Sequence, residues 1–170
     1  MMDEAGADSI PVALAASLTL LAIIVGIAAH GVSGVAPLVS TSSVDGQIFG
    51  LCNDCRELLA CSPRDLLDPF SPPGASKTIV LSLPPDTGYV AFGVDPDSPE
   101  SHEGTIYYMV HGNKKALIVD ERARLREGVK KGGAVVPSSS HMVIEGGGRY
   151  TLTIEYQYDR GLNEKYLVVY

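Results

Sequence analysis

An uncharged apolar run over residues 10–29 limits more than any other feature what this chain can fold into. Its twenty residues, IPVALAASLTLLAIIVGIAA, include only Ser17 and Thr19 as polar interruptions. A helix of this length spans roughly 30 Å, the thickness of the hydrocarbon core of a bilayer. A helix that is apolar on every side needs apolar surroundings, and the rest of a 170-residue chain is too small to enclose it. We therefore predict a hydrophobic transmembrane or filament-core helix over residues 10–30.

Charge is distributed unevenly along the chain. Lys and Arg number 13 against 20 Asp and Glu, and no Lys or Arg precedes Arg56. A cleaved secretory signal is disfavoured, because it has a basic start and a shorter apolar stretch. The basic residues that usually indicate the orientation of a span are also missing. Because the net charge is −7, we expect no nucleic-acid partner.

The residues that lead into the apolar run carry a family resemblance. The segment Gly6-Ala7-Asp8-Ser9-Ile10-Pro11-Val12 resembles the start of archaeal type IV pilins and archaellin-like proteins. In that family a prepilin-type peptidase removes a short leader, and the following helices form a filament core with β-rich heads facing outward. The resemblance implies processing near Gly6 and Ala7. It also implies a cell-surface location, membrane lipid as a partner, and assembly with copies of itself or other pilin-like subunits.

The resemblance covers only the N-terminal part of the chain, and two features depart from the family pattern. Asp3 and Glu4 stand where the family leader has basic residues, and Ile10 separates Ser9 from Pro11. An alternative therefore stays open: a non-polymerising single-span membrane protein with an extracytoplasmic β-sandwich that binds or senses a ligand. Three tyrosines would lie near the ligand cleft of that sandwich: Tyr107, Tyr108 and Tyr150.

Residues 31–76 form a predicted connector that contains a short amphipathic helix and a Pro-rich linker. Ile48, Cys52, Cys55 and Leu59 follow helical spacing, and Ser62-Pro63 ends the pattern. This spacing predicts a helix of about four turns with one apolar face.

Cys52, Cys55 and Cys61 allow three interpretations. A zinc site usually needs four ligands, and on a helix Cys61 points away from Cys52. A disulfide would leave one thiol over. The third interpretation, which we favour, treats Cys52 and Cys55 as small apolar core residues.

Period-two alternation dominates residues 77–170 and predicts an antiparallel β-sandwich-like head. Its clearest run alternates Tyr150, Leu152, Ile154, Tyr156 and Tyr158 with polar residues. Turn sequences rich in Gly, Pro, Asp and Asn separate about seven such runs. Residues 121–133, in which Lys and Arg outnumber Glu, are predicted as a basic surface loop.

Few residues of the head form a recognisable chemical pattern. Asp95, Asp97 and Glu100 supply the carboxylates that Ca²⁺ prefers but lack the EF-hand pattern, and a solvated turn is favoured. Ser140 and His141 are neighbours on an extended chain and point to opposite faces, which disfavours a nucleophile–base pair. We expect neither catalysis nor a cofactor.

These patterns together predict an α+β protein with four parts. Residues 1–9 form a leader or tail, residues 10–30 the hydrophobic helix, residues 31–76 the connector, and residues 77–170 an extracellular head. The expected role is structural, as a pilin-like filament subunit or a minor or accessory pilin.

Overall fold

The computed structural model describes the backbone of residues 9–170 and the side chains of residues 14–27 and 40–170. Gly6 and Ala7, where processing was predicted, lie outside the described residues. The chain divides into two compact units, Met1–Val39 and Ser40–Tyr170. This boundary falls inside the predicted connector, so the β-rich unit begins well before residue 77.

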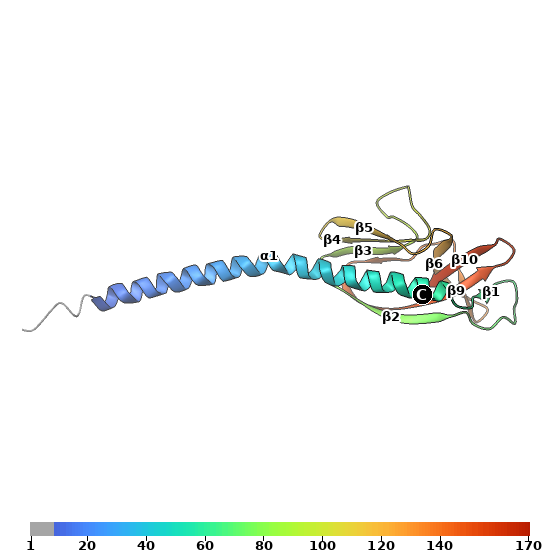
Figure 1. The fold of residues 1–170 in the computed structure, drawn as a ribbon, viewed down its shortest axis with the longest axis horizontal. Coiled ribbons are helices and arrows are strands. Elements are labelled where there is room, and N and C mark those ends of the chain that lie inside the picture. The colour runs from blue at the N-terminus through green and yellow to red at the C-terminus, as the bar shows by residue number, and fades with distance from the viewer. Residues whose placement is uncertain (1–8) are drawn as a thin grey trace, which may run out of the picture. The chain divides into compact units, whose positions relative to one another are not determined.

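Within residues 9–170, one helix precedes ten strands, and the fold is α+β with two sheets, as predicted (Figure 1). The elements are α1 (Ser9–Leu59), β1 (Arg64–Asp65), β2 (Ser76–Leu83), β3 (Thr87–Phe92), β4 (Thr105–Val110), β5 (Asn113–Ile118), β6 (Ala123–Lys131), β7 (Ala134–Pro137), β8 (Val143–Glu145), β9 (Gly148–Asp159) and β10 (Glu164–Val169).

Helix α1 includes both segments that the sequence predicts as separate helices. The prediction of a break between them was wrong, because the backbone of residues 31–43 is helical. Gly and Pro destabilise the interior of a helix by about 1 and 3 kcal/mol relative to Ala, but the surroundings of a helix can outweigh these preferences. The predicted end of the amphipathic segment is correct, since α1 stops at Leu59 ahead of Ser62-Pro63. Among the described residues, no helical stretch has the length and apolarity needed to cross a membrane.

The larger sheet runs in the order β1-β9-β10-β6-β7, and β2 also pairs with β9. The smaller sheet runs in the order β5-β4-β3-β8. Most neighbours are antiparallel, as predicted, but β10 pairs with β6 in parallel and so does β1 with β9. The parallel pairing of β6 and β10 arises because β9 and β10 form a hairpin that places β10 next to β6, a strand much earlier in the chain.

The prediction of a basic surface loop at residues 121–133 was wrong, because most of this segment forms β6. Ala123 and Leu125 are buried, while Arg124 and Arg126, which alternate with them, lie on the other face of the strand. A strand of a half-solvated sheet alternates in this way, so the charged residues mark its outer face. Gly132 and Gly133, with φ of 61° and 85°, then form the turn into β7.

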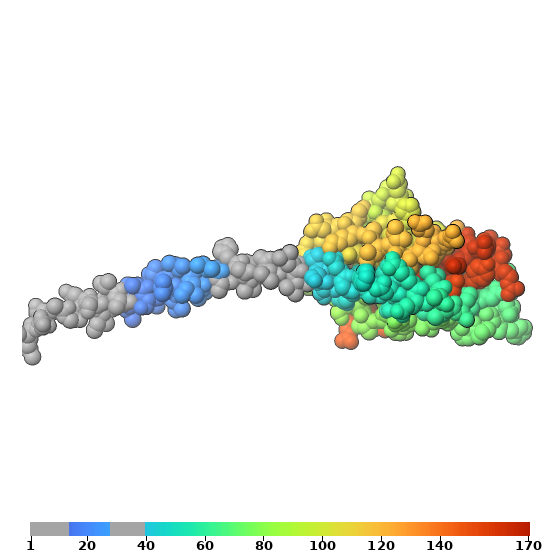
Figure 2. Space-filling model, viewed as in Figure 1, coloured from blue at the N-terminus to red at the C-terminus, as the bar shows by residue number. Residues whose placement is uncertain are grey.

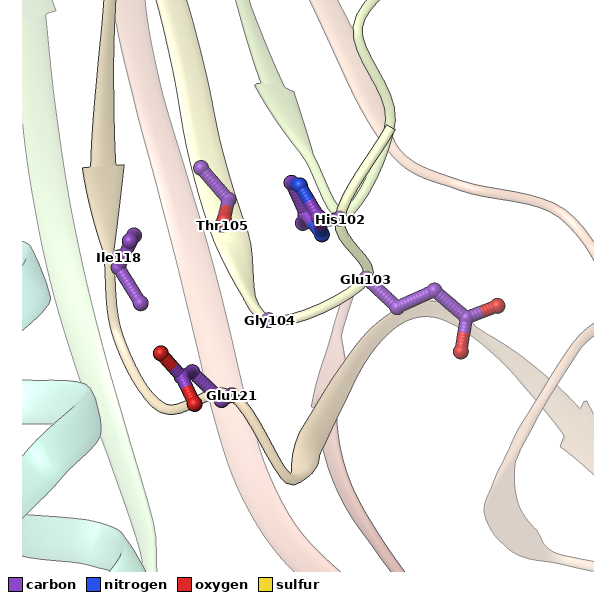
Figure 3. A pocket seen from close by; sticks show the side chains of 6 residues that line it. All are labelled: His102, Glu103, Gly104, Thr105, Ile118 and Glu121. Carbon is purple, nitrogen blue, oxygen red and sulfur yellow. The ribbon is translucent and has the colours of Figure 1, made fainter. Parts of the chain in front are cut away.

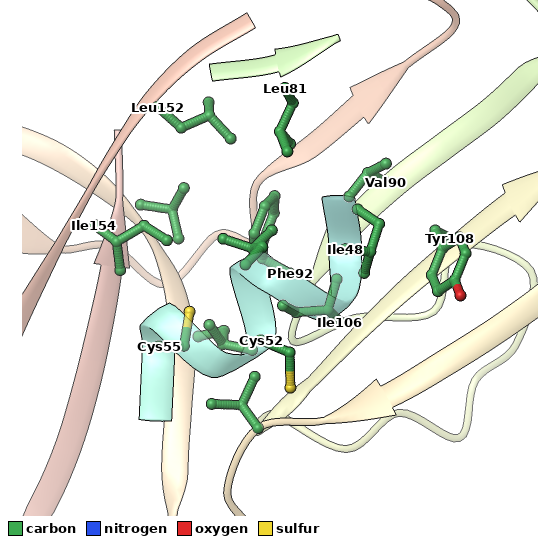
Figure 4. Packing of buried hydrophobic residues seen from close by; sticks show 14 of the residues in the cluster. Ile48, Cys52, Cys55, Leu81, Val90, Phe92, Ile106, Tyr108, Leu152 and Ile154 are labelled. Carbon is green, nitrogen blue, oxygen red and sulfur yellow. The ribbon is translucent and has the colours of Figure 1, made fainter. Parts of the chain in front are cut away.

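The second half of α1 supplies one side of the hydrophobic core (Figure 4). Its apolar stripe is buried, as the helical spacing predicts, and the buried side chains of the two sheets cover it. Each fully buried aliphatic side chain stabilises the fold by about 1.5–3 kcal/mol. The helix residues in the core are Val44, Ile48, Leu51, Cys52, Cys55 and Leu58.

Polar side chains of α1 bond to an outer strand of each sheet. The Gln47 amide makes two hydrogen bonds to the Ser82 backbone in β2. On the other sheet, Arg56 donates to the carbonyl oxygens of Ile118, at 2.6 Å, and Val119, at 3.2 Å, at the end of β5. Helix α1 therefore closes the side of the sandwich between β2 and β5 (Figure 1).

Candidate functional site

Residues 14–27 of α1 expose an apolar surface on every side of the helix. Over residues 14–27, whose side chains are described, every residue is exposed and none is charged. Apolar residues dominate this segment, and the Thr19 hydroxyl donates back to the Ala15 carbonyl at 2.8 Å. The large hydrophobic side chains, each more than half exposed, are Leu14, Leu18, Leu20, Leu21, Ile23, Ile24, Val25 and Ile27. We call residues 14–27 the apolar helix segment.

A second surface feature lies where α1 meets β2. A hollow of about 260 Å³ lies between Gly46, Gly50 and Leu51 of the helix and Ile79 and Val80 of the strand. A Cβ added at Gly46 or Gly50 would meet no atom within 4 Å, so the missing side chains leave this space open. We call this hollow the α1–β2 groove.

The groove has polar groups at both ends. At one end Gln47 holds the Ser82 backbone. At the other, Lys77 donates to Asp54 at 2.6 Å. Between these two contacts lie Val80 of β2 and Gly50 of α1. Val80 itself is 46% exposed.

A pocket of about 310 Å³ lies where β4 begins and β5 ends (Figure 3). Its lining includes His102, Thr105, Ile118 and Glu121, whereas the Glu103 side chain extends away from them. An imidazole, a hydroxyl and a carboxylate offer hydrogen bonds to a small polar molecule. These lining residues include no activated nucleophile with its base.

The Glu103 carboxylate is held by two arginines of β6. Arg124 contacts one carboxylate oxygen at 3.1 Å, and Arg126 bonds to the other. Arg124 also bridges to Glu164 of β10 at 2.6 Å. The sequence-based prediction of a loop did not include this network; the alternation of the arginines with Ala123 and Leu125 is the sequence signal that indicates a strand.

The three cysteines are free thiols in different surroundings. Cys52 and Cys55 are buried, their sulfur atoms point in different directions (Figure 4), and Cys61 is exposed. Burial raises the pKa of Cys55 to about 12, with smaller contributions from Cys52 and Asp54. The positions of Cys52 and Cys55 agree with their interpretation as core residues, and no group of three potential metal ligands occurs among the described residues.

Of the three predicted loop carboxylates, the structure brings two together. Asp95 is buried and accepts hydrogen bonds from Lys114 at 2.8 Å and from the Tyr89 hydroxyl at 3.3 Å. The same hydroxyl lies 3.0 Å from Asp97, whereas the Glu100 side chain is exposed. Although burial opposes ionisation of Asp95, Lys114 and the Asp97 backbone N–H hold its pKa below the usual value. This network anchors the loop that projects from the head between β3 and β4 (Figure 2).

The three tyrosines of the predicted ligand cleft do not lie together. Tyr107 and Tyr108 are neighbours in β4 and therefore point to opposite faces of the sheet. The Tyr108 hydroxyl donates to Asp45 of α1 at 2.9 Å, while Tyr107 accepts the His102 backbone N–H. Tyr150 belongs to the other sheet and donates to the Glu145 carbonyl.

His141 bonds to Arg126 and not to the serines before it. Burial and the Arg126 charge lower the pKa of His141. The Ser138 hydroxyl instead accepts the Ser140 backbone N–H at 2.9 Å. This arrangement provides no serine nucleophile beside the imidazole.

No family model, curated protein or solved structure shows significant similarity to this chain. The residues and contacts described above therefore carry the functional argument.

Proposed function

We propose that this chain is a structural subunit of a pilin-like cell-surface filament, either a main subunit or a minor or accessory pilin. The observation that supports the proposal is the apolar helix segment, whose large side chains are exposed around the whole helix. A helix of this kind is stable when other apolar groups surround it. Copies of the same segment provide such surroundings in a filament, and lipid provides them before assembly.

The uncharged sequence of residues 10–29 supports the same role, because each charge carried into an apolar filament core or bilayer costs free energy. The N-terminal resemblance to archaeal type IV pilins adds a route for assembly, with the leader removed near Gly6 and Ala7. The head is then displayed outside the cell. In this proposal the polar networks of the head fix its own loops and perform no chemistry.

Labelling of the filaments tests the proposal. The full chain carries an epitope tag after Tyr170 in the cells that produce it, and immunogold electron microscopy locates the tag. We expect labelled filaments. Label spread over the cell envelope without filaments would overturn the proposal and favour the single-span binding protein.

A matched pair of variants connects the filament to the apolar helix segment. Leu21→Asp places a charge on a side chain that is 58% exposed, and we expect filaments to be lost. Leu21→Met preserves the apolar surface, and filaments should remain. Intact-mass measurement of the filament protein reports processing, and a chain that still begins at Met1 or Met2 would exclude leader removal.

A further inference from the structure

The pocket where β4 begins and β5 ends contains three polar side chains that have no hydrogen-bond partner among the described residues. They are the His102 imidazole, the Thr105 hydroxyl and the Glu121 carboxylate. Ile118, which pairs with Thr105 in the ladder between β4 and β5, adds an apolar wall (Figure 3). We call the space between these four residues the β4–β5 pocket.

Thr105 is the most informative of the four residues, because it is only 3% exposed. Its backbone N–H donates to the His102 carbonyl at 3.0 Å, and its carbonyl accepts the Gly93 N–H at 2.8 Å. Within the described residues only its hydroxyl is therefore left without a partner, and this group lines the pocket. Polar groups that are withdrawn from water are nearly always hydrogen-bonded, so the hydroxyl favours a polar ligand in this place.

The walls of the β4–β5 pocket are held in position by the rest of the head. The His102 backbone N–H donates to the Tyr107 hydroxyl at 2.9 Å, which fixes one wall. The Val119 N–H donates to the Gly104 carbonyl at 2.9 Å, which fixes the turn that carries Glu121. Because both walls are ordered by these bonds, a ligand needs to order little more than the polar side chains themselves.

Glu121 gives the pocket a carboxylate that has no ion pair within the described part of the chain. The Glu103 carboxylate extends away from the pocket and is held by the two arginines of β6 (Figure 3). Arg122 lines a neighbouring hollow that Glu121 also borders, and it does not line this pocket. The Arg56 guanidinium donates to backbone carbonyls at the end of β5. The Glu121 carboxylate is thus available to a cationic ligand.

We propose that the β4–β5 pocket binds a primary alkyl ammonium group, whose alkyl chain lies against Ile118. An ammonium group has three N–H donors and no acceptor, and the pocket offers three acceptors: a carboxylate, a hydroxyl oxygen and an imidazole nitrogen. The bond to the carboxylate is charge-assisted, which makes it stronger than a bond between neutral groups. This inference goes beyond the proposed function and does not depend on filament assembly.

Titration with a small amine tests the proposal. The full chain, labelled with ¹⁵N in detergent micelles, is titrated with butylammonium chloride at pH 7, and the amide chemical shifts are followed. We expect saturable shifts at residues 102–105 and 118–121. N,N,N-Trimethylbutylammonium keeps the charge and the alkyl chain but has no N–H donor, and butanol keeps the chain without the charge. Both should bind at least about tenfold more weakly than butylammonium.

Two kinds of substitution assign the binding to the pocket. Glu121→Gln preserves the shape of the side chain, removes its charge and should weaken binding at least about tenfold. Thr105→Val removes the hydroxyl and should also weaken binding, whereas Thr105→Ser keeps the hydroxyl and should preserve it. Glu100→Gln is the matched control, because it removes an exposed carboxylate from the same β3–β4 loop as His102 but outside the pocket. Circular dichroism confirms that each variant is folded.

Three results would overturn the proposal. They are equal affinity for butylammonium and its trimethyl analogue, shifts that are absent or fall elsewhere, and equal weakening by Glu121→Gln and Glu100→Gln. The peptide acetyl-glycyl-lysyl-glycinamide identifies the source of the ammonium group. Tighter binding than butylammonium assigns the pocket to a lysine side chain of another polypeptide, and weaker binding assigns it to a free amine. Filaments of the Glu121→Gln chain should form as in the wild type, so failure of the pocket leaves the proposed function standing.

Discussion

The Gln47 side chain pairs with both backbone polar groups of Ser82. Its Oε1 accepts the Ser82 N–H at 2.7 Å, and its Nε2 donates to the Ser82 carbonyl at 2.8 Å. The amide thus replaces the neighbouring strand that β2 lacks on this side. Exposed strand edges pair readily with other chains, so this contact protects the head against aggregation.

Replacement of Gln47 by leucine tests this role. The variant loses both hydrogen bonds to Ser82 and two longer ones to Ser43, and we expect the free energy of unfolding to fall by about 1–3 kcal/mol. Urea denaturation measures the change, and light scattering of the folded protein should report more aggregation. Ser82→Ala is the control, because Gln47 contacts only the backbone of that residue.

The ion pair between buried Asp95 and exposed Lys114 predicts a pH-dependent contribution to stability. The pKa of Asp95 is lower in the folded chain than in the unfolded chain. Its contribution is therefore fully present above the unfolded pKa of about 3.9 and is lost as the pH falls through the lower folded value. Lys114→Met should lower the free energy of unfolding at pH 7, because it leaves the buried Asp95 carboxylate without its ammonium partner.

The difference between Lys114→Met and the wild type should narrow as the pH falls, because a neutral Asp95 carboxyl no longer needs the ammonium group. Unfolding measured at several pH values between 2 and 7 gives this comparison. Lys130→Met, which removes an exposed lysine of β6, should change little at any pH. A constant difference for Lys114→Met across the range would contradict the assignment.

The cysteines should react in a fixed order. Burial raises the pKa of Cys55 to about 12, so almost no thiolate exists at pH 8. We expect iodoacetamide to modify exposed Cys61 in the folded chain and Cys52 and Cys55 only after denaturation. Peptide mass spectrometry identifies the modified residues, and rapid labelling of Cys55 without denaturant would show that the core opens.

Replacement by alanine at two glycines should change the free energy of unfolding in opposite directions. A Cβ at Gly104 would lie 1.8 Å from the Asp120 carbonyl oxygen, so Gly104→Ala requires the backbone to move. We expect it to lower the free energy of unfolding by more than about 2 kcal/mol. A Cβ added at Gly46 in α1 would meet no atom within 4 Å, so Gly46→Ala should raise the free energy of unfolding by about 0.5–1 kcal/mol. Thermal unfolding of both variants tests the difference in sign.

Most strands were predictable because alternation and turn residues are local signals. The run from Tyr150 to Tyr158 lies within β9, and the stripe through Ile48, Cys52 and Cys55 is buried as its helical spacing indicates. These patterns report which side of an element is buried. They do not report what covers it, so the packing of α1 inside the β head was not predictable.

The errors have two physical sources. The basic residues of β6 are typical of a surface loop by their charge, whereas the alternation of Ala123 and Leu125 with them is typical of a strand. The α1–β2 groove and the Asp95–Lys114 pair depend on contacts between residues far apart in sequence. Local spacing cannot show that Gly50 lies across from Val80, or that Lys114 reaches Asp95.

The position of β10 has a consequence for synthesis. This strand follows the other nine strands in sequence, yet it lies between β9 and β6 inside the larger sheet. Residues 164–169 must therefore leave the ribosome before the sheet can close. Until then β6 and β9 lack a shared neighbour, and a chain that stops before Glu164 leaves two unpaired edges that proteases and chaperones can recognise.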